Sequence, residues 1–189
     1  MSHFTKVATK INDLAALQNA LETMGLKLEH HVPCRYYYGT QIRENVAKLP
    51  GYNSYDVAFE KNADGTYSID ADFYNGTVEQ TIGVSGSTLM RQYAMEKVKM
   101  EARKKRYSVH DYGNGKLKIY DPLDRTGAFL EATIDETGNI SFKAKGFVGK
   151  KCMSFSSLED AIGVTERKYT DEYHQSERRA EVELLRQKE

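Results

Sequence analysis

The sequence contains no tryptophan and has only two cysteines and three prolines among its 189 residues. Two cysteines, Cys34 and Cys152, are too few for a disulfide framework, which favours a reducing compartment. The chain also lacks net charge, since 27 basic residues balance 27 acidic ones, so no long-range field would draw it to nucleic acid or an anionic membrane. No hydrophobic run approaches the length of a membrane span or of a signal-peptide core. We therefore expect a cytoplasmic protein that does not enter a membrane.

Three hairpin signals are the most informative local features. They are Asp64-Gly65, the stretch from Gly113 to Gly115, and Thr137-Gly138, each lying between segments of alternating polarity. We interpret all three as three-residue connections that include a left-handed glycine, because Asp-Gly and similar pairs favour such turns. The predicted cross-strand pairs are Phe59 with Ile69 and Val57 with Ala71, Val109 with Ile119, and Ile134 with Ile140, Ala132 with Phe142 and Leu130 with Ala144.

Apolar residues at helical spacing predict the helices. One is expected from the cap candidates Asn12 and Asp13 to Gly25, and a second from near Ser87 to just before Tyr107. A third is expected over 152–162, and a polar helix from Thr170 onward. A weakly alternating strand is predicted over 4–11, while 40–54 and 74–86 lack periodicity and are interpreted as ordered surface loops, the latter able to close over a groove.

The thirteen tyrosines include a run at Tyr36-Tyr37-Tyr38. Aromatic residues are common in strands, so this run is typical of a strand surface, and it would also serve as a stacking surface. Both interpretations stay open at the level of sequence.

An acidic cluster is the first candidate site. If Phe59 and Ile69 face the core, then Asp56, Glu60, Asp70 and Asp72 face outward, with Asp56 opposite Asp72. Like charges paired across strands are destabilising. Three forms of compensation are possible: basic side chains of this chain, of which 103–106 is the nearest source in the sequence, a basic protein partner, or a divalent metal ion.

A basic run is the second candidate site. Lys97, Arg103, Lys104, Lys105 and Arg106 lie on or at the end of the second predicted helix, interrupted by acidic residues. Such a run is typical of a solvated helix face, and phosphate binding is the alternative.

The two cysteines give weaker signals. His31 and Cys34 have a spacing compatible with zinc, but two ligands do not form a site. Cys152 falls at the start of a predicted helix after Lys150 and Lys151, where a thiol could become reactive. Its place on an apolar stripe with Phe155 and Leu158 favours a buried, unreactive thiol instead.

Motifs in the two parts of the chain resemble two different families. Residues 1–121, with Ser2-His3-Phe4, Tyr55-Asp56-Val57-Ala58-Phe59 and Asp64-Gly65-Thr66-Tyr67, resemble the hypothetical chloroplast reading frame thirty-five family, whose function is unknown. Residues 128–175, with Gly146-Phe147 and Gly149-Lys150-Lys151-Cys152, resemble a second small bacterial family of unknown function. The resemblance implies a fusion of two modules, followed here by a charged tail at 176–189. Members of both families are often encoded beside a MoxR-like AAA ATPase, which implies an accessory or adaptor protein for such an ATPase.

We expect an α+β fold in which antiparallel β-hairpins pack against helices, arranged as two hairpin-plus-helix modules and a C-terminal polar helix. The favoured function is a non-enzymatic adaptor without a cofactor, which binds a protein rather than nucleic acid through the acidic outer face of the hairpin at 55–73. The alternatives are a metal-dependent hydrolase that uses Asp56, Asp70 and Asp72, and a nucleic-acid-binding module that uses the helix at 97–106.

Overall fold

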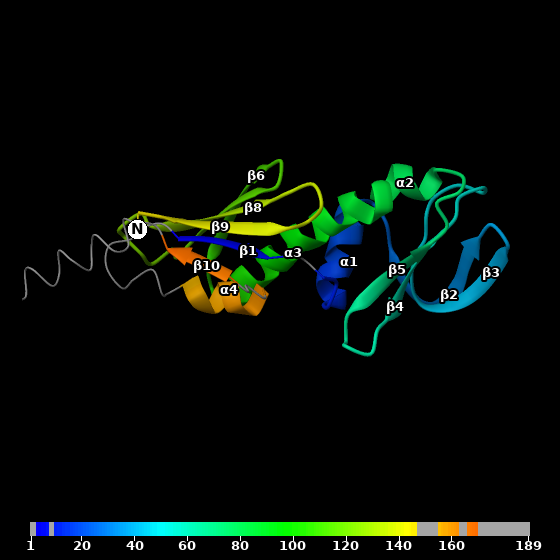
Figure 1. Ribbon diagram of the computed structural model, residues 1–189, viewed down its shortest axis with the longest axis horizontal. Helices are drawn as coiled ribbons and strands as arrows, with labels where there is room; N and C mark the ends of the chain where they lie inside the picture. The colour runs from blue at the N-terminus through cyan, green and yellow to red at the C-terminus, as the bar shows by residue number, and fades with distance from the viewer. Residues whose placement is uncertain (1–2, 8–9, 147–154, 163–165, 170–189) are drawn as a thin grey trace, which may run out of the picture. The chain divides into compact units, whose positions relative to one another are not determined.

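The computed structural model describes residues 3–7, 10–146, 155–162 and 166–169 (Figure 1). Its fold is α+β, with antiparallel hairpins and helices, as the sequence predicts. The described strands form a six-stranded sheet of order β10-β1-β9-β8-β7-β6 and a four-stranded sheet of order β2-β3-β4-β5. None of the helices in the described ranges is long and apolar enough to cross a membrane.

The chain divides into two compact units. Unit 1 comprises residues 1–8, 98–135 and 139–189, and unit 2 comprises residues 9–97 and 136–138. The boundary falls within helix α3 (Ser87–Lys104), between Lys97 and Val98. The boundaries of these two units differ from those of the predicted sequence modules, 1–121 and 128–175. The modules stay a prediction.

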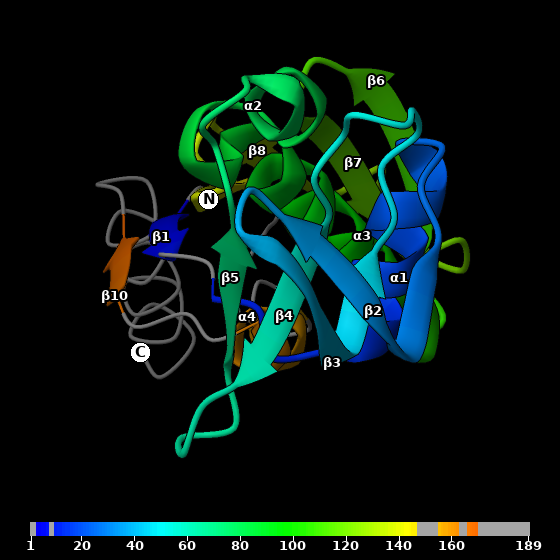
Figure 2. The same cartoon turned by 90° about the vertical axis from the view of Figure 1, so that its right-hand side faces the viewer.

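Unit 2 holds the four-stranded sheet and helix α1, which lies behind that sheet in Figure 2. Its elements are α1 (Leu14–Thr23), β2 (Leu28–Tyr36), β3 (Gly39–Ala47), β4 (Val57–Lys61), β5 (Tyr67–Ala71), α2 (Thr77–Ile82), a 3-10 turn (Val84–Gly86) and the first part of α3. Asp13 caps α1 as predicted, because its side chain accepts hydrogen bonds from the backbone N–H groups of Ala15 and Ala16. The fully buried Leu17, Leu21 and Phe59 belong to its core.

Unit 1 holds the six-stranded sheet with the end of α3 and helix α4. Its remaining elements are β1 (His3–Val7), β6 (Ser108–Gly113), β7 (Lys116–Tyr120), β8 (Phe129–Ile134), β9 (Ile140–Lys145), α4 (Ser156–Ile162) and β10 (Glu166–Tyr169). The inward side chains alternate along each strand, and those of Leu117, Ile119, Leu130 and Phe142 are fully buried.

The hairpin registers are confirmed, with one correction in a turn. All the predicted cross-strand pairs are present. The connection at Asn114 and Gly115, however, is a two-residue turn closed by Gly113 opposite Lys116, and a bulge between Asp111 and Gly113 restores the predicted register. Both turn residues have positive φ, 49° and 76°, which is the type I′ conformation favoured by Asn-Gly.

Two segments interpreted as loops contain regular structure. The predicted loop at 40–54 is strand β3 as far as Ala47, and the predicted loop at 74–86 contains α2 and the 3-10 turn. The first half of β3 shows no alternation because both of its faces are largely exposed, so the usual period-two signal is missing. The N-terminal strand ends at Val7 rather than at Ile11, which instead forms an isolated bridge with Tyr67. The predicted start of the helix at Cys152 and the polar helix after Thr170 lie outside the described residues.

Candidate functional site

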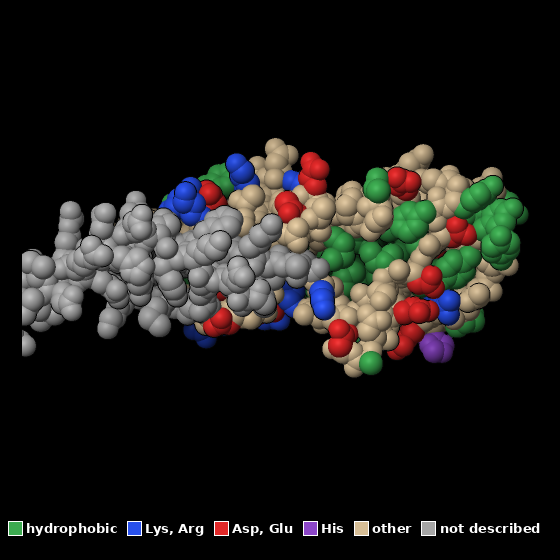
Figure 3. Space-filling model, viewed as in Figure 1, with side chains coloured by type: hydrophobic (Ala, Val, Ile, Leu, Met, Phe, Trp, Pro, Cys, Tyr) green, Lys and Arg blue, Asp and Glu red, His purple; other side chains and the backbone are tan. Residues whose placement is uncertain are grey.

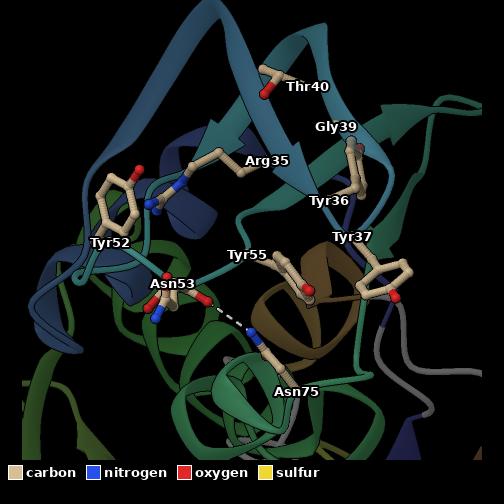
Figure 4. Close-up of a pocket in the computed structure, with 10 residues that line it drawn as sticks. Arg35, Tyr36, Tyr37, Gly39, Thr40, Tyr52, Asn53, Tyr55 and Asn75 are labelled. Atoms are coloured by element: carbon tan, nitrogen blue, oxygen red, sulfur yellow. Dashed lines mark hydrogen bonds between the residues drawn. The ribbon is translucent and has the colours of Figure 1, made fainter.

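An open pocket of about 670 Å³ lies in unit 2, where three separate segments of the chain meet (Figure 4). One segment is the β2–β3 turn, the second is the loop after β3, and the third is the loop before α2. The lining residues are Arg35, Tyr36, Tyr37, Gly39, Thr40, Tyr52, Asn53, Ser54, Tyr55 and Asn75. We call this the tyrosine pocket. In the view of Figure 4, Tyr55 lies between Tyr52 and Tyr37, and the amide of Asn75 donates a hydrogen bond of 2.8 Å to the Asn53 carbonyl oxygen.

The tyrosines at the rim are unusually exposed. Tyr52 is 98% exposed and Tyr37 is 52% exposed. The ring of Tyr37 contacts that of Tyr38 edge-on at 4.7 Å and that of Tyr74 at 5.0 Å, and these neighbours are 95% and 78% exposed. Figure 3 shows hydrophobic side chains, a class that includes tyrosine, gathered over the β2–β3 hairpin. A contiguous exposed aromatic surface of this kind marks an interaction site more often than it serves stability.

Asp72 holds two of these tyrosines in place. One carboxylate oxygen accepts a hydrogen bond from the backbone N–H of Tyr37 at 3.0 Å, and the other accepts one from the backbone N–H of Tyr74, also at 3.0 Å. Tyr37 lies 35 residues before Asp72 in the sequence, whereas Tyr74 lies two residues after it. Asp72 therefore ties the β2–β3 turn to the loop that follows β5.

Asp56 is fully buried beneath the loop of the pocket, and not exposed as the sequence-based prediction had it. Strand β4 begins only at Val57, so Asp56 has no partner in the β4–β5 register and does not lie opposite Asp72 in a strand pair. Its carboxylate accepts hydrogen bonds from the Arg35 Nη2 at 2.6 Å and Nε at 2.9 Å, from the Lys48 Nζ at 3.1 Å, and from the backbone N–H groups of Arg35 and Leu49.

These donors decide the ionisation of Asp56. Burial alone would raise the pKa of Asp56, but the hydrogen bonds from Arg35 and Lys48 outweigh burial and hold this pKa below its ordinary value. Arg35 in turn donates from Nη1 to the Gly51 carbonyl at 2.8 Å and from Nη2 to the Leu49 carbonyl at 2.6 Å. The Arg35–Asp56 pair thus fixes the loop at 48–56, which supplies Tyr52, Asn53 and Tyr55 to the pocket.

Arg43 forms ion pairs with both Glu60 and Asp70. The guanidinium group of Arg43 lies 3.2 Å from a carboxylate oxygen of Glu60 and 3.2 Å from one of Asp70. The Tyr36 hydroxyl donates to Asp70 at 2.9 Å. Compensation from within the chain was one of the sequence-based alternatives, but the ion pairs that the structure shows for these carboxylates come from Arg35, Arg43 and Lys48 and not from 103–106.

The predicted basic run is divided among several partners. Lys97 lies 3.6 Å from Asp13, Lys99 forms a 2.8 Å ion pair with Asp111, and Lys104 pairs with Glu101 on the same helix. Arg103 and Arg106 are exposed and Lys105 is partly exposed. Lys97 and Lys104 are thus already paired with carboxylates, while the interpretation of the whole run as a solvated helix face stays a prediction.

The thiol and metal candidates do not meet in one place. Cys34 is fully buried, in a small cluster with Val46 and Ala58, whereas His31 is exposed. Cys152 lies outside the described residues. Within the described ranges, no group of three or more His, Cys, Asp or Glu side chains could hold a metal ion.

Sequence reasoning missed the pocket as a site, although it noted one of its parts. The sequence of Tyr36-Tyr37-Tyr38 fits either a strand surface or a stacking surface, and in the structure Tyr37 and Tyr38 are exposed just after the end of β2. Tyr52, Asn53 and Asn75 carried no local signal, because only the tertiary fold brings their loops beside the β2–β3 turn.

Comparison with known proteins gives two family matches. Residues 130–174 match a family described as a protein of unknown function, DUF2997, and residues 20–117 match another with the same description, DUF1257. A chain composed of two families of unknown function agrees with the two-part organisation expected from the motifs, while the link to the chloroplast reading frame stays an expectation. No curated protein and no solved structure gives a significant match. The match at 20–117 covers just over half of the chain, so the chain belongs to the DUF1257 family of proteins of unknown function.

Proposed function

We propose that the chain is a non-enzymatic cytoplasmic adaptor that binds a partner protein through the tyrosine pocket. The observation that supports this most directly is the exposure of Tyr52 at 98% and Tyr37 at 52% on either side of one pocket. Tyrosine is enriched at protein interfaces because it offers a large apolar surface together with a polar hydroxyl, at a low cost in conformational entropy.

The chemistry of the lining favours binding over catalysis. Arg35 is the one charged residue in the lining, and its guanidinium group is already bound to Asp56 and to two carbonyl groups. Burial, together with the charge of Asp72, raises the pKa of Tyr55, so this hydroxyl stays protonated near neutral pH. The lining includes neither a histidine nor a cysteine. It offers hydroxyl and amide groups that bind, and no group tuned to move a proton or attack a substrate.

The same lining favours an extended, uncharged peptide segment as the occupant. Within the described part of the chain, the hydroxyls of Tyr37, Tyr52 and Tyr55 make no hydrogen bond. A polyproline II segment has no internal hydrogen bonds, so its carbonyl groups can accept bonds from these hydroxyls while its apolar rings pack on the aromatic faces. A charged ligand would find no free opposite charge among the residues that line the pocket.

The acidic hairpin has a different role in this proposal from the one expected of it. Asp56 and Asp72 position the loops of the pocket, and Glu60 and Asp70 share an ion pair with Arg43. The partner-facing surface therefore moves from the hairpin's carboxylates to the tyrosines that they hold. A MoxR-like AAA ATPase, which the family resemblance implies, is the first protein to test as the partner.

Fluorescence anisotropy with labelled decapeptides would test the proposal. The probes are a peptide of alternating proline and leucine, a glycine-serine peptide and a glutamate-rich peptide of the same length. We expect the proline-leucine peptide to bind best and the variant Tyr37→Ala/Tyr52→Ala to lose at least tenfold in affinity, because stacking and hydroxyl contacts of two tyrosines disappear. The matched control is Tyr112→Ala, which removes a tyrosine of unit 1 that is 60% exposed.

A pull-down with the purified MoxR-like ATPase of the source organism gives a second measurement. We expect the Tyr37→Ala/Tyr52→Ala variant to lose binding to the ATPase and the Tyr112→Ala control to retain it. Equal binding of all three peptides, or unchanged binding by the double tyrosine variant in both assays, would overturn the assignment of the pocket.

A further inference from the structure

The outward face of strands β6 to β9 in unit 1 is a second surface with its own chemistry. Leu117, Ile119 and Leu130 point into the core, so the residues that alternate with them point outward. Asp111 pairs with Leu117 across β6 and β7, so both side chains lie on the same, inward face of the sheet. Because Lys99 of α3 forms an ion pair with Asp111, α3 lies on that inward face. Figures 1 and 2 show α3 and α4 on one side of this sheet. The open sheet face is the other side, which displays Tyr112, Lys116, Lys118, Tyr120, Phe129 and Lys143.

The charge on the open sheet face is predominantly positive. Lys116 and Lys143 are exposed, and in the described ranges neither they nor Lys118 form an ion pair with a carboxylate. Lys145 lies on the same face and forms a 2.8 Å ion pair with Glu131. One glutamate thus faces four lysines, which leaves an excess of positive charge on a face of a chain whose total charge is zero.

Aromatic rings lie among these lysines. Ile119 of β7 pairs with Leu130 of β8 in antiparallel register. Tyr120, which follows Ile119, and Phe129, which precedes Leu130, are therefore neighbours on the outward face. The Nζ of Lys118 lies 4.4 Å from the centroid of the Phe129 ring and 5.8 Å from that of Tyr120. Tyr112 is 60% exposed and Tyr120 is 37% exposed. Cross-strand neighbours are about 5 Å apart and alternate residues along a strand about 7 Å apart, so the rings of Tyr120 and Phe129 lie within reach of the same lysine side chains.

We propose that the open sheet face binds single-stranded nucleic acid. Unpaired bases stack on Tyr120 and Tyr112, while Lys116, Lys118 and Lys143 contact the phosphates. An antiparallel sheet that displays aromatic and basic side chains is a recurrent platform for unpaired bases, which a duplex keeps inside its own stack. An acidic peptide would form ion pairs with the lysines, but its carboxylates would make no stacking contact with the exposed rings. This proposal rests on unit 1 alone and is independent of the tyrosine pocket and of the helix at 97–106.

Anisotropy with fluorescein-labelled decamers of oligouridylate and oligothymidylate, and with a duplex of equal length, would test it. We expect the single strands to bind and the duplex to bind at least tenfold more weakly. For single strands log K falls with log salt by about 0.7 per phosphate contact, so three lysines predict a slope of about −2. The variant Lys116→Gln/Lys143→Gln should lower the affinity about tenfold and reduce the slope to about −0.7, because one lysine contact remains.

Three variants serve as matched controls. Lys27→Gln/Lys61→Gln removes two exposed lysines of unit 2 and should bind like the unmodified protein. Tyr120→Phe should retain binding, since the aromatic ring remains. Tyr120→Ser should weaken binding at least fivefold because stacking is lost, but the salt slope should stay unchanged because every phosphate contact is kept. Absence of binding at low salt, equal competition by polyglutamate, or loss of binding only on Arg103→Gln/Lys105→Gln/Arg106→Gln would each overturn the proposal.

Discussion

Replacement of Asp56 by asparagine should be the most damaging single change in unit 2. The carboxylate is fully buried and satisfies two cationic side chains and two backbone N–H groups, whereas asparagine offers one acceptor oxygen and turns an amide donor toward these donors. Breaking a buried ion pair by removing one partner costs about 3–5 kcal/mol. The side chains of Arg35 and Lys48 are 32% and 29% exposed, so water can solvate them in part. We therefore expect the lower end, a loss of about 3 kcal/mol in the free energy of unfolding.

Urea denaturation at pH 7, followed by tyrosine fluorescence and circular dichroism, measures this loss. Glu60→Gln is the matched control, because Glu60 also loses an arginine partner but its side chain is 51% exposed. A surface pair of this kind contributes about 0–1 kcal/mol. A double-mutant cycle with Arg35→Met isolates the pair itself, since methionine keeps the packing of the aliphatic stem. Equal losses for Asp56→Asn and Glu60→Gln would refute the reasoning.

The dependence on pH gives an independent check. The pKa of Asp56 is lowered in the folded state, so its ionised form stabilises the fold above the unfolded pKa of about 3.9 and this stabilisation is lost as the pH falls through the folded value. The difference between the unmodified protein and Asp56→Asn should thus be constant from about pH 5 to pH 8 and shrink below about pH 4. A difference that is the same at pH 7 and pH 3 would show that the charge of Asp56 is not responsible.

Three further predictions concern other parts of the molecule. Gly138→Ala should destabilise the protein by about 1–3 kcal/mol more than Gly127→Ala in urea denaturation, because both glycines have positive φ but only at Gly138 would a Cβ lie 2.7 Å from the Met90 carbonyl oxygen. Cys34 should react with a thiol reagent only after denaturation, as burial raises the pKa of its thiol and excludes the reagent, and rapid labelling of Cys34 in the native protein by mass spectrometry would contradict this. A chain cut between Asp121 and Ala128 should elute as one species from a size-exclusion column, because β7 pairs with β8 and β1 pairs with β9 across the cut, and separation of the fragments without denaturant would contradict it.

The parts of the fold that were predictable depend on local chemistry. Asp64-Gly65 predicted both the turn and the register, since Gly65 adopts φ of 83° and donates to the Asn62 carbonyl at 3.0 Å. Once a turn is placed, strand alternation determines every later pair, which is why Phe59 lies opposite Ile69. Asn114-Gly115 is compatible with two turn lengths, and the bulge that absorbs the extra residue has no separate sequence signal.

The candidate site was less predictable because its contacts join distant segments. Extending the alternation of β4 backward by one residue placed Asp56 on the outer face, but its partner Arg35 is 21 residues away and draws it into the protein. A buried carboxylate needs hydrogen-bonding or cationic partners, and no sequence pattern within 55–73 indicates where these partners come from. The exposure of Tyr52 likewise depends on where the loop anchored by Arg35 comes to lie.

The six-stranded sheet shows that the family boundary in the sequence is not a boundary in the fold. Strands β8 and β9 fall in the match at 130–174 or at its border, while β6 and the start of β7 fall in the match at 20–117. Strand β1 lies between β9 and β10, and β7 covers the other edge of β8. Residues 128–175 alone would therefore leave both long edges of the β8–β9 hairpin unpaired, which invites association with another strand. In this chain those edges are paired with β1 and β7, which both lie outside residues 128–175.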